Sequence, residues 1–210
     1  MIRERHQIYS RLFLSLLAAM ALSQLSKPTM TALAGMARHA DRYTSPKSIV
    51  LTVHDLPAGF GTGFTQSATT VTNAQVASVE GVSLATMNRY RITGYQTSFL
   101  RKVRKGMVSV ADSIGVYKSA SAAHWQYGKF TAIYKVPSGS QSVSMAGIGD
   151  EARGYMLSAR SPGFPLSAAN MYIRRGRYTA RVDSFSFGPQ RVADLIRVAQ
   201  LLDQRMRKAR

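Results

Sequence analysis

The stretch NMYIRRGRYTARV, residues 170–182, decides the fold, because its pattern predicts a β-hairpin with one apolar and one basic face. With a two-residue turn at Arg175-Gly176, Arg174 pairs with Arg177 across the two strands. The same register pairs Ile173 with Tyr178, Tyr172 with Thr179 and Asn170 with Arg181. The predicted core face then consists of Met171, Ile173, Tyr178, Ala180 and Val182.

The opposite face of this hairpin is basic, and we take it as the candidate ligand-binding site. Arg174 and Arg177 stand directly opposite one another, and like charges in that position repel by a few tenths of a kcal/mol. Either an anion lies between them or the end of the hairpin is well solvated. Guanidinium groups suit bidentate contacts with phosphate and carboxylate. The candidate site is Tyr172, Arg174, Arg175, Arg177 and Arg181, with Tyr172 exposed beside the arginines.

Further hairpin and helix patterns place this hairpin in an α+β domain. Residues 92–102 and 106–117 alternate between apolar and polar, and the basic connection between them with Gly106 predicts an antiparallel pair. Residues 48–53, SIVLTV, are expected to form the first strand. Helices are expected at 72–81, capped by Thr72 or Asn73, and at 119–130, capped by Ser119 with Ala120, Ala123 and Tyr127 inside. The chain from Pro189 predicts an amphipathic helix. The expected fold is an antiparallel sheet of hairpins with helices packed on one face, ending in that helix.

Asp112 is the anomaly in this pattern, because it falls in the apolar phase of its strand. A buried carboxylate needs polar partners. We expect a bulge that turns Asp112 outward; the alternative is an arginine or backbone donors inside the protein.

The N-terminus resembles a secretory signal. Arg3, Arg5 and Arg11 precede the apolar run LFLSLLAAMAL, residues 12–22, which is too short to span a bilayer comfortably. Cleavage could follow Ser23 or Ala34; the alternatives are an uncleaved anchor and a buried helix. We therefore expect a signal peptide or anchor at 1–23, a flexible arm at 24–46 and a single α+β domain at 47–210.

Charge and cysteine content limit the partners. The 210 residues include 28 basic and 10 acidic residues, a net charge of +18, which favours attraction to polyanions. A positive surface could also serve only solubility. The chain has no cysteine, which excludes disulfides, disulfide-linked partners and thiolate sites.

Motifs for catalysis or for cofactor binding are not found. The glycines of HDLPAGFGTGF, residues 54–64, lack the spacing and following helix of a phosphate or dinucleotide loop, so they indicate a turn at Leu56–Gly59 and a flexible or bulged segment. The histidines His6, His39, His54 and His124 lie apart in the sequence. Asp150-Glu151 is the one acidic pair, and Asp150 is best interpreted as a turn residue bonding nearby amides. We expect no catalytic residue, metal or cofactor.

The combined pattern resembles a group of uncharacterised secreted bacterial proteins. The segments that carry the resemblance are DLPAGF (55–60), RITGYQTSF (91–99), VYKSASAA (116–123), GDEARGY (149–155), RRGRYTARV (174–182) and the final amphipathic helix. The group has no assigned activity and so implies no catalytic residues. The order of elements also loosely resembles the sheet-and-helix fold of photosystem P-subunit-like and Mog-like proteins, which are mostly binding or accessory modules.

These observations favour a secreted or envelope-facing, non-enzymatic binding module. The expected location is extracellular, periplasmic or in the cell envelope, and the expected partner is an anionic polymer or lipid surface. Nucleic acid is a less natural partner for an exported protein. Two alternatives stay open: an accessory protein that binds another protein through its sheet, and an enzyme of unfamiliar type. The enzyme would need a concave pocket where Asp112, Asp150, Glu151 or His124 converge.

Overall fold

Seven strands carry the fold. The computed structural model describes residues 43–103, 106–133, 140–161, 164–188 and 191–209. The expected signal segment 1–23 and most of the expected arm 24–46 lie outside these residues, and a compact unit begins at Ser45. The strands are β1 (Thr65–Thr70), β2 (Arg91–Val103), β3 (Gly106–Tyr117), β4 (Gln141–Val143), β5 (Glu151–Ser161), β6 (Phe164–Arg175) and β7 (Tyr178–Ser186).

The helices begin where the sequence supplies caps. Thr72 and Gln75 form a capping box at the α-helix that begins at Asn73, and Gly81 ends it with a φ of 65°. Ser119 accepts the N–H of Ala122 at 3.1 Å at a later helix, as expected. The helices are α2 (Asn73–Glu80), α3 (Leu84–Tyr90), α4 (Ala120–Ile133) and α5 (Val192–Lys208), with 3₁₀ turns η1 (Pro46–Ser48), η2 (Val53–Asp55) and η3 (Ala58–Phe60).

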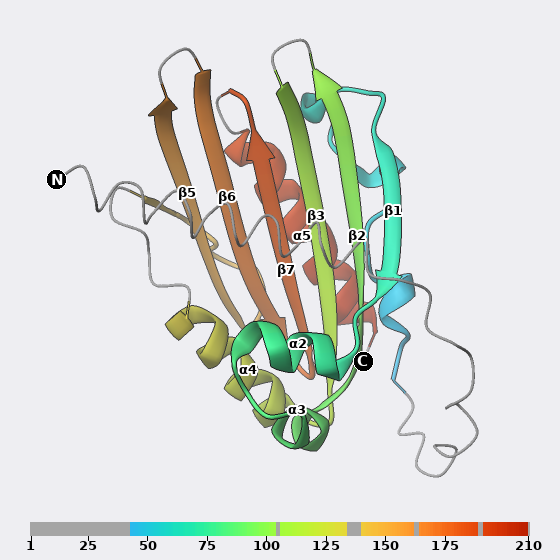
Figure 1. The fold of residues 1–210 in the computed structure, drawn as a ribbon. Coiled ribbons are helices and arrows are strands. Elements are labelled where there is room, and N and C mark those ends of the chain that lie inside the picture. Colours follow the sequence, from blue (N-terminus) through green and yellow to red (C-terminus); the bar gives the residue numbers. More distant parts are fainter. Residues whose placement is uncertain (1–42, 104–105, 134–139, 162–163, 189–190, 210) are drawn as a thin grey trace, which may run out of the picture. The chain divides into compact units, whose positions relative to one another are not determined.

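The strands form one antiparallel sheet in the order β1-β2-β3-β7-β6-β5-β4. Both predicted hairpins, β2–β3 and β6–β7, are present. They join side by side through β3 and β7, so that Val116 pairs with Tyr178 and Val108 with Ser186. The middle of the sheet is therefore formed by two neighbouring strands, β3 and β7, that lie far apart in the sequence (Figure 1).

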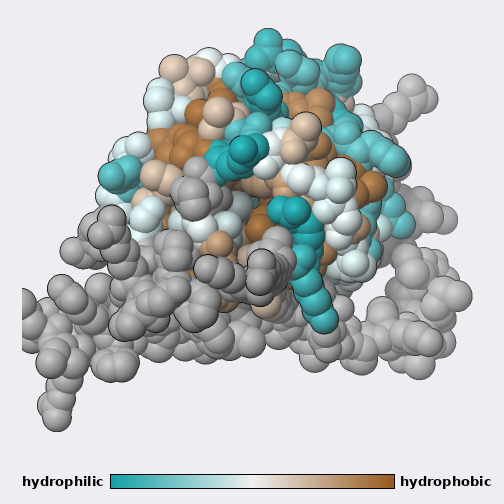
Figure 2. Space-filling model, turned by 90° about the horizontal axis from the view of Figure 1, so that it is seen from above, coloured by the Kyte–Doolittle hydropathy of each residue, from teal (hydrophilic) through white to brown (hydrophobic). Residues whose placement is uncertain are grey.

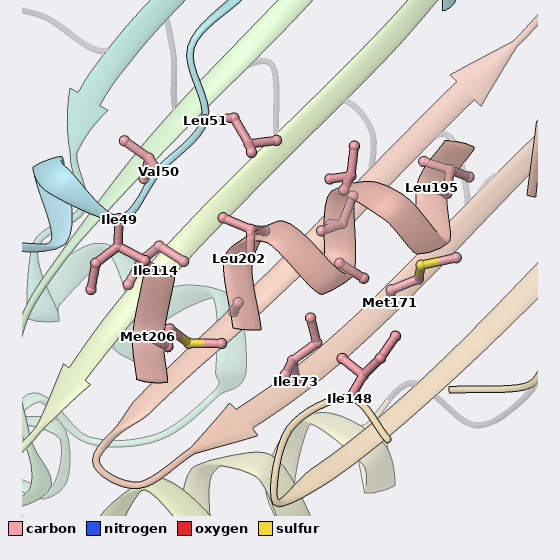
Figure 3. Close-up of a cluster of buried hydrophobic side chains, with 14 of the residues drawn as sticks. Ile49, Val50, Leu51, Ile114, Ile148, Met171, Ile173, Leu195, Leu202 and Met206 are labelled. Carbon is pink, nitrogen blue, oxygen red and sulfur yellow. The ribbon is translucent and has the colours of Figure 1, made fainter. Parts of the chain in front are cut away.

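The helices lie on both faces of this sheet. The amphipathic helix α5 packs on one face, where Leu195, Leu202 and Met206 meet Met171 and Ile173 of β6 (Figure 3). On the other face, α4 covers the hairpin end of β6 and β7, and α2 and α3 lie beside it at the same end of the sheet (Figure 1). The α+β class and the final amphipathic helix are confirmed, whereas the sequence led us to expect the helices on one face.

At the opposite end of the sheet, β2 and β5 end and β3 and β6 begin. Seen along the strands, this end shows hydrophilic and hydrophobic residues interspersed (Figure 2). No helix among the described residues has the length and apolar character needed to cross a bilayer.

The segment expected as the first strand is not a strand. Ile49, Val50 and Leu51 are all buried and pack onto the core beside α5 (Figure 3). In a strand, successive side chains point to opposite faces, so three consecutive residues do not all enter one core. Here the segment follows the turn η1 and covers the core as irregular chain.

Asp112 holds this irregular segment in place, and the expected bulge is absent. The β2–β3 and β3–β7 pairing runs through Asp112 without interruption, so its side chain points into the core. Its carboxylate accepts the Leu51 N–H at 3.2 Å and the hydroxyl hydrogen of Thr97. Burial raises the pKa of Asp112 to about 7, because these two donors only partly replace the lost hydration. The alternative of backbone donors inside the protein was therefore the right one.

The glycine-rich stretch forms turns, as its spacing indicated. The hydrogen bond from Phe60 N to Pro57 O places the turn one residue later than predicted, in η3. Gly61 and Gly63 follow with φ of 84° and 80°, values that favour glycine.

Candidate functional site: the arginine hairpin

The turn of the β6–β7 hairpin lies one residue later than predicted. Arg175 pairs with Tyr178, Arg174 with Thr179 and Tyr172 with Arg181, which leaves Gly176 and Arg177 as the turn. Gly176 has a φ of 56°, the left-handed conformation that such a turn requires. Because every partner shifts by two residues, the division into faces is unchanged. The five residues predicted for the core face are all buried.

Arg174 and Arg175 converge on Asp150. Nη1 of Arg174 lies 3.2 Å from Asp150 Oδ2, and Nη1 of Arg175 lies 2.8 Å from Asp150 Oδ1. The N–H of Gly176 also donates to Asp150, at 2.7 Å. Burial alone would raise the pKa of Asp150, but the Gly176 N–H and the two guanidinium groups outweigh it and hold the pKa below its ordinary value. Asp150 therefore bonds a turn far along the chain.

Arg175 also fastens the hairpin to α5. Its Nε and Nη2 donate to the two oxygens of Asp203 at 2.7 and 2.8 Å, a bidentate arrangement. The side chains of Arg175 and Asp203 are 12% and 5% exposed. Arg207 reaches the same carboxylate from one helical turn further on, at 3.1 Å. Burial would raise the pKa of Asp203, but the Arg175 guanidinium outweighs it, so the pKa is lowered.

Arg174 links the hairpin to Glu151 and, through it, to α4. Its Nε donates to Glu151 Oε1, and His124 Nδ1 lies 2.8 Å from the same oxygen. Burial would raise the pKa of Glu151, but the hydrogen bonds from His124 and Arg174 lower it overall. Asp150 and Glu151 both reach Arg174 because Asp150 precedes β5 and Glu151 begins it, so the alternation of side chains along a strand does not separate them.

Arg177 and Arg181 make separate contacts. Arg177 donates from Nε to Tyr117 O at 3.0 Å and from Nη2 to Lys118 O at 2.5 Å, which secures the end of β3. Arg181 pairs with Asp183 at 2.8 Å, and its guanidinium lies 5.6 Å from the ring centre of Tyr172.

Tyr172 is not the exposed aromatic residue that we expected. It is 1% exposed and lies beneath α4, where its ring centre is 5.8 Å from that of Phe130. Tyr127 and Tyr155 complete this small cluster. Of the stripe predicted inside α4, Ala123 and Tyr127 are buried but Ala120 is exposed, because α4 turns Ala122 and Gln126 inward instead.

The structure thus collects three of the four groups named for a possible enzyme. Asp150, Glu151 and His124 meet around Arg174, while Asp112 lies in the core beside Leu51. The described residues contain no group of three side chains placed to hold a metal ion. A shallow hollow of about 460 Å³ lies next to this network, between α5 and the loop before β5; it is lined by Gly147, Asp203, Gln204 and Arg207 among others.

Sequence analysis missed Asp203 as a partner of the hairpin. A signal was present, because Asp203 stands four residues after Ala199 and beside Leu202 in the apolar stripe of α5. An acidic residue in the apolar phase of a helix needs a charged or hydrogen-bonding partner in the core, and Arg175 is such a partner.

Comparisons with known proteins show the fold alone. No family model matches the chain, and no curated protein matches it in sequence. Among solved structures, the extracellular domain of PknH from Mycobacterium tuberculosis is similar, with a TM-score of 0.50 and 10% identity over 79% of this chain and 98% of that one. A putative uncharacterised protein from Mycobacterium smegmatis matches with a TM-score of 0.30 and 12% identity, over 75% of this chain and 94% of that one.

Proposed function

We propose that this protein is an exported, non-enzymatic binding module whose ligand is an anionic polymer or lipid surface of the cell envelope. The observation that carries the proposal is the distribution of its charges. The basic flank and apolar run at the N-terminus support export, as does the fold shared with a domain described as extracellular.

Every carboxylate of the described residues is already engaged within the protein. Besides Asp150, Glu151, Asp183 and Asp203, Asp55 binds Arg205 at 2.6 Å, and Asp194 lies 3.5 Å from Arg191. The two remaining carboxylates, Glu80 and Asp112, accept hydrogen bonds from uncharged groups. Within the described ranges, no carboxylate is left without a partner in the protein.

Several exposed cations consequently have no carboxylate within 4.0 Å among the described residues. This uncompensated charge attracts polyanions, and the attraction weakens with salt. The exposed cations of this kind are Lys47, Arg89, Lys102, Lys118, Lys129, Arg153 and Lys208.

The acidic network at the hairpin does not favour the enzyme alternative. General acid or base catalysis works best when the pKa of the catalytic group lies near the operating pH. The Gly176 N–H lowers the pKa of Asp150 and the His124 hydrogen bond lowers that of Glu151, and the arginines lower both further, away from neutrality.

The arginine hairpin keeps its place as a candidate ligand site, with one added condition. An anion that binds Arg174 or Arg175 competes with Asp150, Glu151 and Asp203, which already occupy their donors. The uncompensated exposed cations face no such competitor, so we assign them the larger share of binding.

Two charge-matched variants separate these contributions. One replaces Arg174, Arg175, Arg177 and Arg181 with Gln; the other replaces Lys47, Arg89, Lys118 and Lys129 with Gln. Binding of folded protein to polyphosphate and to anionic vesicles is measured at low and moderate salt, with circular dichroism as the folding control. We expect the second variant to lose more affinity and more salt dependence. A larger loss in the hairpin variant would place the ligand at the hairpin, and salt-independent or absent binding by the unaltered protein would end the proposal.

Export is tested by fractionating the host cells and sequencing the N-terminus of the protein. A cytosolic chain that keeps Met1 would contradict export, and an intact chain fixed in the membrane would support the anchor.

A further inference from the structure

The end of the molecule formed by α2, α3 and α4 carries an aromatic pair flanked by cations. Tyr90, the last residue of α3, stacks on Trp125 of α4 with ring centres 4.7 Å apart. Arg89 lies over the Tyr90 ring at 5.6 Å, and Lys129 lies over the Trp125 ring at 5.9 Å. These residues form a four-membered row, which we call the cation–aromatic row. Lys118 adjoins it, since its N–H donates to Tyr90 O at 2.9 Å.

The exposed charged side chains of α2, α3 and α4 are all basic. Arg89, Lys118 and Lys129 are exposed and have no carboxylate within 4.0 Å among the described residues. The three helices contain a single acid, Glu80, and it is turned toward α4. Nε2 of the buried Gln126 donates to both Glu80 oxygens at 2.6 Å. Burial raises the pKa of Glu80, because solvation of its charge is reduced.

The same end also exposes apolar side chains. Val79 of α2 and Leu84 of α3 are each 47% exposed. Contact with a hydrated polyanion does not remove exposed aliphatic groups from water and so gives no favourable free energy. Insertion into the acyl layer just below lipid headgroups does remove them from water and is favourable. Trp and Tyr favour that boundary because one part of each ring system is apolar and the other polar.

The geometry of the two rings favours a lipid surface over a polysaccharide as the partner. A sugar binds aromatic residues by stacking on a free ring face. In this row, the two rings stack on each other, and Arg89 and Lys129 lie over them as well. Charge is therefore presented outward by the cations, with the aromatic groups beneath and between them.

We propose that the α2–α4 end docks on an anionic phospholipid bilayer, with Arg89, Lys118 and Lys129 at the headgroups and Trp125 at the interface. This proposal rests on the proposed anion-binding function and names its partner and its site. No described carboxylate pairs with these three cations, so an anionic headgroup meets no competing carboxylate there.

Trp125 provides a direct test, because it is the only tryptophan of the chain. Full-length protein is titrated with phosphatidylcholine vesicles with and without about one-third phosphatidylglycerol, and binding to the neutral vesicles measures the contribution of the apolar run 12–22. With anionic vesicles, we expect a blue shift of the emission and quenching by lipids brominated near the headgroup end of the acyl chain. Unchanged Trp125 emission in protein that binds these vesicles would overturn the docking proposal.

Charge-matched variants then locate the contact. One variant carries Arg89→Gln, Lys118→Gln and Lys129→Gln. The control carries three changes away from this end, Lys102→Gln, Arg191→Gln and Arg197→Gln. A basic side chain near an anionic membrane contributes about fivefold in affinity, so the first variant should lose roughly 100-fold and the control much less. Circular dichroism of both variants verifies that each is folded.

The outcomes distinguish the two proposals. Equal losses in the two variants would overturn the docking site while leaving anion binding in place. Binding to soluble polyphosphate without binding to anionic vesicles would overturn the lipid partner and favour a polymer. Failure of the unaltered protein to bind either probe would remove the proposed function as well as the site.

Discussion

Replacing Asp112 with Asn should make the stability of the protein less sensitive to pH between pH 4 and pH 8. Asp112 lies buried in the core with only the Leu51 N–H and the Thr97 hydroxyl as hydrogen-bond donors. Its pKa is raised by burial from 3.8 to about 7 in the folded protein. Between these values the folded state holds a proton that the unfolded state has released. Stability from this group is therefore fully present below pH 3.8 and is lost as the pH rises toward 7.

The size of the effect follows from the pKa difference. A rise of about three units corresponds to about 4 kcal/mol between the low-pH and high-pH limits, at about 1.4 kcal/mol per unit. Asparagine has the shape of the protonated carboxyl and does not ionise in this range. The free energy of unfolding of Asp112→Asn minus that of the unaltered protein should therefore increase by about 4 kcal/mol from pH 4 to pH 8, then level off.

Urea unfolding, followed by circular dichroism at a series of pH values, measures this difference. Taking the difference cancels the opposing contributions of the carboxylates with lowered pKa, such as Asp150 and Asp203, which both proteins share. A pH-independent offset in the free energy of unfolding between the two proteins reports only the replacement of the carboxyl hydroxyl by the amide NH₂ group. A difference that stays flat across the series would refute the buried, proton-holding carboxyl.

Three further substitutions test the packing around the hairpin and α5 by their effect on urea unfolding. Arg175→Ala leaves the Asp203 carboxylate buried without its bidentate partner and should cost about 3 kcal/mol. Arg197→Ala removes a side chain that is 71% exposed and should cost under about 0.5 kcal/mol. Equal costs would contradict a stabilising Arg175–Asp203 pair. Gly149→Ala should destabilise the protein more than Gly147→Ala. Both glycines have a positive φ, but only at Gly149 would the added Cβ lie 2.8 Å from Arg174 O, so the two costs should differ by about 1 kcal/mol or more. The reverse order of costs would contradict the close approach at Gly149. Leu202→Ala, at a fully buried position of α5, should cost about 3 kcal/mol, and a cost below about 1 kcal/mol would mean that α5 does not complete the core.

The sequence predicted local elements well, because their signals are local. The β6–β7 faces follow from strict alternation, and the α2 and α4 starts follow from Thr72 and Ser119 as caps. The hairpin turn was placed one residue early because Arg175-Gly176 and Gly176-Arg177 both put a glycine in the turn, and either register leaves the faces the same. The alternation of side chains could not distinguish them.

The long-range contacts could not be predicted from these patterns. The partners of Arg174 and Arg175 come from two separate parts of the chain, at Asp150-Glu151 and at Asp203. The sequence indicated that the hairpin is basic, but only the sheet order and the position of α5 determine which acids reach it. For the same reason the burial of Tyr172 was not predicted, because it depends on α4 crossing that face of the sheet.

The junction between β3 and β7 has a consequence for the order in which the chain folds. Val108 pairs with Ser186 and Val116 with Tyr178, and the face they help to form is closed by α5, which starts only at Val192. During synthesis, the β2–β3 hairpin therefore emerges with a β3 edge that stays unpaired until β7 is available, and with an apolar face that stays uncovered until α5 is available. Chains dominated by such distant pairings fold slowly. A nascent chain of this design therefore keeps an incomplete sheet and an open core at least until α5 has been synthesised.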